Sequence, residues 1–90
     1  MNDSGTSLYA FTLGVHHVEL QAHADQSLSL WLDGIMRKQR GEGGGPAWLW
    51  TNVELPFEDH HLVEVRRDAE GTLDLRVNDT PLDEFLADQG

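Results

Sequence analysis

The chain has no cysteine, only one lysine (Lys38) and no hydrophobic run longer than a few residues. Without cysteine, the protein has neither a disulfide framework nor thiol chemistry. Its longest apolar runs, such as 48–50, are far too short to span a bilayer. The first residues also lack the basic and apolar regions of a signal peptide, so we expect a cytoplasmic protein.

Basic residues are scarce, with 6 Lys and Arg against 16 Asp and Glu and a net charge of −10. Affinity for nucleic acid comes from neutralising phosphates with Lys and Arg, so the acidic composition predicts no nucleic-acid partner. Anionic membrane surfaces are disfavoured for the same reason, and we expect no membrane partner. The composition also fits a salt-adapted or GC-rich source, and salt adaptation predicts loss of the fold on dilution into low salt.

The strongest pattern is an ungapped repeat, in which residues 18–34 recur as residues 63–79, 45 positions later. Five positions are identical in the two copies: Val18/Val63, Glu19/Glu64, Ala24/Ala69, Leu28/Leu73 and Leu30/Leu75. Each copy holds two alternating apolar segments around a polar turn, which predicts two equivalent β-hairpins. Nothing in the repeated pattern resembles an active site.

Alternation of apolar and polar side chains predicts strands over six segments: 8–13, 15–24, 27–32, 47–53, 61–67 and 72–78. The basic and glycine-rich segment 37–45 predicts a mobile loop. Residues 55–57 read as an edge or irregular segment, because Pro56 cannot donate to a ladder.

The C-terminal segment begins like a helix, with Thr80 as the N-cap and Pro81 as the first helical residue. Leu82, Phe85 and Leu86 would form its apolar face and plug the sandwich. The sequence therefore predicts a single all-β domain over 8–90, after a flexible segment 1–7. Its fold class is a small antiparallel β-sandwich or flattened barrel, built from two repeated hairpins and closed by a short C-terminal helical turn.

Five histidines are the residues most suggestive of chemistry: His16, His17, His23, His60 and His61. Imidazoles can bind Zn, Ni or Cu. However, adjacent strand residues point to opposite faces, so each histidine pair supplies at most one ligand to a shared site. We therefore interpret the histidines as strand-end residues near turns, and we predict no metal site and no cofactor.

Three tryptophans and a basic segment form the candidate interaction surface: Trp31, Trp48, Trp50, Arg37, Lys38 and Arg40. Trp48 and Trp50 share one face of a predicted strand. On a solvated face they would form a stacking platform for sugars or an oligomer interface. The interpretation we favour for these two is partial cover by the terminal helix or by a partner chain, and both interpretations stay open for Trp31.

The segment 37–40 could bind an anion, but the glycines that follow have the wrong spacing for a phosphate loop and no Gly-Lys-Ser/Thr follows. We interpret it as a solvated basic segment. No serine lies in a nucleophile elbow, and a thin sandwich offers no obvious deep pocket. The sequence therefore predicts no enzyme.

Several motifs resemble one domain of the Fas apoptosis inhibitory molecule family over about residues 9–87. They are Gly-Val-His-His-Val-Glu-Leu at 14–20, Leu-Trp-Leu-Asp-Gly at 30–34, Ala-Trp-Leu-Trp at 47–50, and the segment 72–82 with Phe85. Asp79 replaces the family's usual glycine. The resemblance implies a compact β-sandwich without catalysis that acts through protein contacts. Animal members carry two such domains, so a chain with one is compatible with a homodimer.

A second, narrower resemblance links residues 60–78 to the central hairpin of laminin-G or concanavalin-like lectin domains, which are substantially longer than this chain. It implies carbohydrate binding, with Trp31, Trp48 and Trp50 as the platform. The expected function is thus a non-enzymatic interaction or structural module with an unidentified protein partner, and the alternative is a small lectin-like domain.

Overall fold

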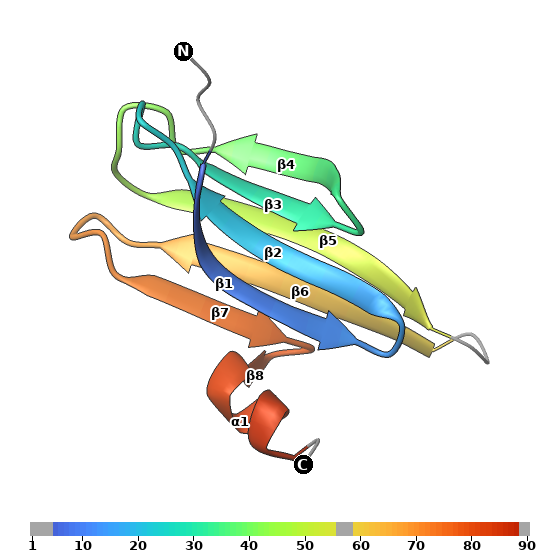
Figure 1. Cartoon of the computed structure of the whole chain (residues 1–90). Coiled ribbons are helices and arrows are strands. Elements are labelled where there is room, and N and C mark those ends of the chain that lie inside the picture. The colour runs from blue at the N-terminus through green and yellow to red at the C-terminus, as the bar shows by residue number, and fades with distance from the viewer. Residues whose placement is uncertain (1–4, 56–58, 89–90) are drawn as a thin grey trace.

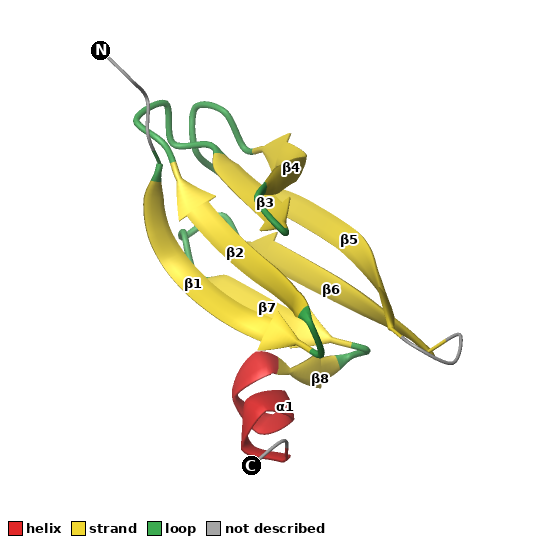
Figure 2. Ribbon diagram, turned by 45° about the vertical axis from the view of Figure 1, so that its right-hand side comes forward, coloured by secondary structure: helices red, strands yellow, loops and turns green. Residues whose placement is uncertain are grey.

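The computed structural model describes residues 5–55 and 59–88, and these form two stacked antiparallel sheets and a short helix (Figures 1 and 2). The first sheet has the order β1 (Thr6–Leu13), β2 (His16–Ala22), β3 (Leu28–Leu32), β4 (Ile35–Arg40). The second has the order β5 (Ala47–Leu55), β6 (Asp59–Arg67), β7 (Leu73–Val77), β8 (Thr80–Pro81), and α1 (Leu82–Asp88) follows. The predicted all-β sandwich with a C-terminal helical turn is confirmed.

One apolar core lies between the two sheets. Alternate side chains of each strand point inward, because successive strand residues face opposite sides. The buried apolar residues are Phe11, Leu13, Val18, Leu20, Leu28, Leu30, Leu49, Val53, Val63, Val65, Leu75, Val77 and Leu82. Both copies of the repeat supply their leucines and valines to this core, so the repeated pattern records the inward face of each hairpin.

The repeat is also present in individual hydrogen bonds at the open end of each hairpin, away from its turn. In the β2–β3 hairpin, the Asp33 amide donates to the His17 carbonyl and Asp33 Oδ1 accepts from the His17 amide, both at 2.8 Å. In the β6–β7 hairpin, the Asn78 amide donates to the Leu62 carbonyl at 2.9 Å, and Asn78 Oδ1 accepts from the Leu62 amide at 2.8 Å. The prediction of two equivalent hairpins is therefore confirmed.

The two-residue turns that follow the repeated hairpins, between β3 and β4 and between β7 and β8, each place two successive residues at positive φ. The values are 53° and 79° at Asp33 and Gly34, and 51° and 66° at Asn78 and Asp79. Two-residue turns of this kind match the twist of the flanking strands, and glycine adopts them without a steric cost. Asp79 is thus the position at which the second turn is strained relative to the first.

Asp79→Gly is expected to raise the free energy of unfolding by about 0.5–1 kcal/mol, because relief of left-handed strain exceeds the added entropy of the unfolded chain. The reverse change in the other copy, Gly34→Asp, is expected to lower it by a similar amount. Urea unfolding of both variants measures the two effects. Shifts of the same sign would contradict this explanation of the turns.

The structure corrects the prediction of a mobile loop over 37–45. Residues 37–40 belong to β4, in which Lys38 pairs with Leu30 and Arg40 pairs with Leu28. Arg37 lies in a bulge between those pairs and the Trp31–Met36 pair. Charged side chains and a bulge are common on edge strands, where they discourage pairing with other chains.

The remaining connection, 41–46, is anchored by one arginine of β6. Arg67 donates from Nε to the Gly45 carbonyl at 2.6 Å, from Nη1 to the Gln26 carbonyl at 2.7 Å and from Nη2 to the Gly41 carbonyl at 2.9 Å. One guanidinium thus joins β6 to two separate turns at the same end of the sandwich.

Element boundaries near both ends of the chain also differ from the prediction. β1 begins at Thr6, so Thr6 and Ser7 of the predicted flexible segment 1–7 pair with β2, and residues 1–4 of that segment lie outside the described residues. Thr80 and Pro81 pair with β7 as β8, so the helix begins after Pro81 and Thr80 does not cap it. Of the predicted apolar helix face, Leu82 is buried and Phe85 half-buried, whereas Leu86 is exposed. Of the predicted edge or irregular segment 55–57, Leu55 is the last residue of β5, and residues 56–57 lie outside the described residues.

Candidate functional site

Trp48 and Trp50 lie side by side on the outer face of β5. Leu49 and Thr51 alternate with them and point into the core, which confirms the shared face predicted from the sequence. The two rings have centroids 4.5 Å apart and planes inclined by 32°. Trp48 is 47% exposed and Trp50 is half-buried. An aromatic pair of this kind contributes stability beyond that of its buried area, and the Trp48 ring remains partly open to solvent.

Each tryptophan carries a cation over its ring. Lys38 Nζ lies 4.6 Å from the centroid of the Trp50 ring, and Arg66 Cζ lies 5.2 Å from the centroid of the Trp48 ring. Arg66 is the cross-strand partner of Trp48, so their side chains share a face. These cations attract the ring faces electrostatically and neutralise part of an acidic surface.

Lys38 reaches Trp50 from the other sheet. β4 and β5 belong to different sheets but lie next to each other along one edge of the sandwich. Lys38 pairs with Leu30, whose side chain is in the core, so its stem begins on the inner side of β4. Its ammonium then extends past the edge to Trp50, which leaves the stem half-buried and the charge at the surface.

Glu64 is the carboxylate that contacts the tryptophan pair. It pairs with Trp50 across β5 and β6, and only 9% of its side chain is exposed. Glu64 Oε2 accepts a hydrogen bond from Trp48 Nε1 at 3.1 Å and a longer one from Arg66 Nη2 at 3.4 Å. A nearly buried carboxylate needs such donors, and it in turn fixes the orientation of the Trp48 ring.

Sequence reasoning did not select Glu64 or Arg66. A signal was available: both occupy outward positions of β6, alternating with the buried Val63 and Val65. What the sequence could not supply was the register that sets these two residues opposite Trp50 and Trp48. We call this set of side chains the tryptophan surface: Trp48, Trp50, Lys38, Glu64 and Arg66.

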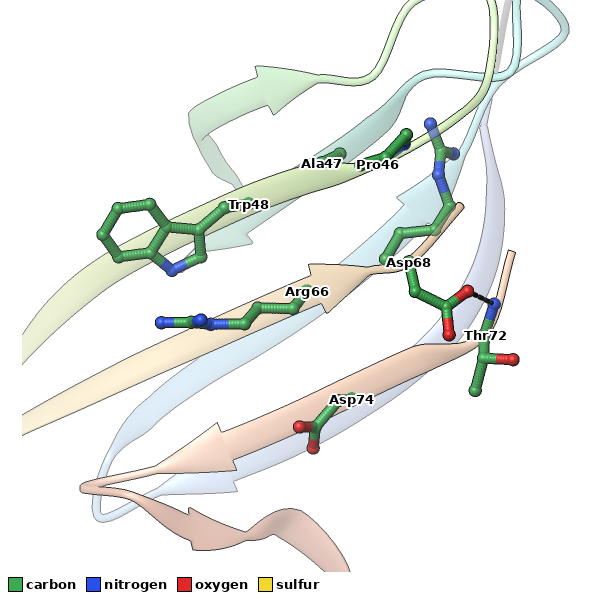
Figure 3. A pocket seen from close by; sticks show the side chains of 8 residues that line it. Pro46, Ala47, Trp48, Arg66, Asp68, Thr72 and Asp74 are labelled. Atoms are coloured by element: carbon green, nitrogen blue, oxygen red, sulfur yellow. Dashed lines mark hydrogen bonds between the residues drawn. The ribbon is translucent and has the colours of Figure 1, made fainter. Parts of the chain in front are cut away.

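A groove lies on either side of this surface. The β4–β5 groove has a volume of about 420 Å³ and is lined by Ile35, Met36, Arg37, Lys38, Trp50, Thr51 and Asn52. The β6–β7 groove has about 610 Å³ and is lined by Pro46, Ala47, Trp48, Arg66, Arg67, Asp68, Thr72 and Asp74 (Figure 3). The first groove carries two cations and no acid among its lining residues, whereas the second mixes two arginines with two aspartates.

The structure places the six residues of the predicted interaction surface in three separate regions. Trp48, Trp50, Arg37 and Lys38 gather at the β4–β5 edge. Trp31 lies on the outer face of the first sheet, on the opposite side of the sandwich, where its Nε1 donates to Ser29 Oγ at 2.7 Å. Arg40 lies apart in a hollow with Asp25, Ser27, Gln39, Gly41 and Glu42.

The terminal helix does not cover Trp48 and Trp50, so the predicted cover by that helix is wrong. α1 packs against β7 and β8, and β8 is at the opposite edge of the second sheet from β5 (Figure 1). Phe85 of the helix instead lies against the His61 ring, with centroids 5.8 Å apart. Cover of the tryptophan rings comes from Lys38, from Arg66 and from each other.

The histidines occupy separate positions, and no group of three His, Cys, Asp or Glu able to hold a metal occurs among residues 5–55 and 59–88. His16 opens β2, and its Nδ1 lies 2.7 Å from Oδ2 of Asp33, which follows β3 at the same open end of the hairpin. This hydrogen bond is the main cause that raises the pKa of His16 above its ordinary value of 6.5 and lowers the pKa of Asp33 below 3.8.

The His16–Asp33 pair predicts a pH-dependent stability. The raised His16 pKa contributes stability that is complete below 6.5 and is lost as the pH rises through the folded value. The lowered Asp33 pKa contributes stability that is present above 3.8 and is lost as the pH falls through the folded value. The pair therefore stabilises the fold most between these two limits.

His16→Gln is expected to flatten the dependence of the thermal midpoint on pH above about 6. Asp33→Asn should do the same while keeping an oxygen for the His17 amide, as Asn78 does in the second copy. Thermal unfolding of the three proteins across this pH range makes the comparison. An identical slope in all three would contradict the assignment.

In the described part of the chain, no helix is long and apolar enough to cross a membrane. The site is built by side chains that stack, pair and accept hydrogen bonds on the outer face of a sheet. Comparisons of the chain with protein-family models, with curated proteins and with solved structures found no match.

Proposed function

We propose that this chain is a non-enzymatic β-sandwich module that binds another protein through the tryptophan surface. The observation that carries the proposal is the stacked pair of Trp48 and Trp50, with cations over both rings, on the outer face of a sheet. Tryptophan and arginine dominate the energetics of protein interfaces, because they offer a large and rigid contact area. The outer face of a sheet without a partner is ordinarily polar.

The resemblance to the Fas apoptosis inhibitory molecule family supports the same function, since its members act through protein contacts. It motivates the proposal and does not identify a partner. A cytoplasmic location likewise stays a prediction from the sequence.

Carbohydrate binding is the alternative, and the ring geometry argues against it. A sugar stacks on an open and flat aromatic face. Here the Trp50 face carries Lys38, the Trp48 face carries Arg66, and the two rings are inclined to each other. Sugar binding would have to displace at least one of these cations.

Site-specific photo-crosslinking in cells tests the proposal. A photoreactive amino acid at Asn52, an exposed residue that shares the outer side of β5 with Trp50, is expected to yield protein adducts. The same probe at Thr12, an exposed residue on the first sheet, serves as the matched control. Adducts from Asn52 should be lost when Trp48 and Trp50 are both replaced by alanine.

Adducts no more frequent at Asn52 than at Thr12 would contradict the proposal. A change in tryptophan fluorescence on a glycan panel, without protein adducts, would favour the lectin-like alternative instead. Folding of the double variant is checked by circular dichroism before either result is interpreted.

The homodimer suggested by the sequence stays a prediction. A second copy would bring together two chains of net charge −10, which costs electrostatic repulsion unless the basic edge of one chain meets acids of the other. Light scattering at tens of micromolar distinguishes the states, since a dimer has twice the chain mass of 10.1 kDa.

A further inference from the structure

The β4–β5 groove combines charge, apolar contacts and strand edges in one place. Arg37 and Lys38 line it from β4, Trp50 lines it from β5, and the exposed Ile35 and Met36 lie at its rim. β4 is the last strand of the first sheet and β5 the first strand of the second. The groove therefore runs between two sheet edges, a place where extended peptides bind.

The charge of this groove is opposite to that of the molecule. The chain has 16 acidic and 6 basic residues, yet the groove is lined by two cations and by no acid. A site of one sign raises the local concentration of ligands of the other sign and speeds their association. A ligand that is complementary in charge to this groove therefore carries carboxylates.

The edge of β5 adds a backbone component. β5 pairs with β6 over nine residues, and in the sheet order it has no hydrogen-bonded strand on its other side among the described residues. Thr51 and Asn52 of this edge line the groove. A partner strand can take main-chain hydrogen bonds from such an edge, while its side chains enter the flanking pockets.

We propose that the β4–β5 groove binds an extended, acidic segment of a partner protein. Its carboxylates meet Arg37 and Lys38, and an apolar side chain between them packs on the exposed Ile35 and Met36. The inference rests on the proposed function and specifies the chemistry of the partner. Nucleic acid and anionic lipid are disfavoured, because the surrounding negative charge of the chain repels their extended polyanionic surfaces.

The test uses fluorescein-labelled octapeptides in which Glu alternates with Val, with matched peptides in which Lys or Gln replaces Glu. Anisotropy is expected to show binding of the Glu peptide to the intact chain and little binding of the Lys peptide. The affinity for the Glu peptide should fall about fivefold or more as NaCl rises from about 0.05 to about 0.5 M, because exposed charges are screened.

Variants locate the binding. Arg37→Gln and Lys38→Gln should each weaken binding of the Glu peptide about threefold, and the two together about tenfold, as expected for exposed charge pairs. Arg40→Gln is the matched control, since it removes a cation from the same strand outside the groove, and it should bind like the wild type. Thermal unfolding confirms that each variant is folded.

Equal binding of the Lys and Glu peptides, or wild-type affinity in the double variant, would overturn the inference. Tighter binding of a single-stranded oligonucleotide or of phosphatidylserine vesicles would overturn it as well. Asn52 crosslinks that need the tryptophans but not Arg37 and Lys38 would leave the proposed function standing without its acidic partner. If the Asn52 probe in the otherwise unsubstituted chain gave no more crosslinks than the Thr12 control, the proposed function itself would be contradicted.

Discussion

Leu49→Ala is expected to lower the free energy of unfolding by about 3–4 kcal/mol, the largest effect of any single substitution considered for this chain. Leu49 is 0% exposed in the middle of β5, where it meets buried side chains of both sheets. Truncation removes its transfer free energy and leaves a cavity that a close-packed core fills only in part. For a domain of this size, total stability is about 5–13 kcal/mol, so the loss is between about a quarter and about four-fifths of it.

Urea unfolding followed by circular dichroism measures the loss. Leu86→Ala is the matched control, because Leu86 is 40% exposed on α1 and alanine suits a helix. Its effect is expected to stay within about 0.5 kcal/mol. Similar losses in the two variants would mean that the core between the sheets does not dominate stability.

Arg67→Ala is expected to cost about 2–3 kcal/mol and to release the connection 41–46. The guanidinium of Arg67 donates to three carbonyls in two separate turns, and charge-assisted bonds of this kind contribute more than neutral ones. Because Arg67 is partly exposed to water, its three hydrogen bonds together contribute less stability than three fully buried ones would. Arg67→Lys should recover only part of the loss, since an ammonium cannot reproduce the planar fork.

Arg66→Ala provides the comparison for Arg67, because it deletes the neighbouring arginine. The Arg66 side chain is 62% exposed and makes one long contact with Glu64, so the expected loss is below about 1 kcal/mol. Hydrogen exchange adds a local measurement: the Gly43 amide donates to the Asp25 carbonyl at 2.8 Å and should lose protection only in the Arg67 variant. Equal losses in both variants would contradict the anchoring role of Arg67.

The inward face of the sandwich could be predicted from the sequence because its information is local. Leu28 and Leu30, and their counterparts Leu73 and Leu75, alternate with polar residues, and a period of two has one interpretation in a half-buried strand. The turn at Asp33 and Gly34 could be predicted in the same way, from residues that tolerate positive φ.

β4 was missed because no local pattern distinguishes it. Arg37, Lys38 and Arg40 form a charged segment beside glycines, which alone favours a loop. In the folded chain this segment lies against β3, and the ladder bonds offered by Leu28 and Leu30 exceed its weak strand propensity. The same pairing brings Lys38 to Trp50 and makes the groove.

The strand content, the two equivalent hairpins and the residues that fill the core follow from local sequence patterns, because alternation and turn chemistry act between neighbours in the chain. Which outward residues meet depends on how the strands and sheets pack in the folded chain. Trp50 and Lys38 come from different sheets, and Arg67 anchors turns 26 and 41 residues away along the chain. Such contacts depend on register and on the stacking of the two sheets, which single-residue preferences do not encode.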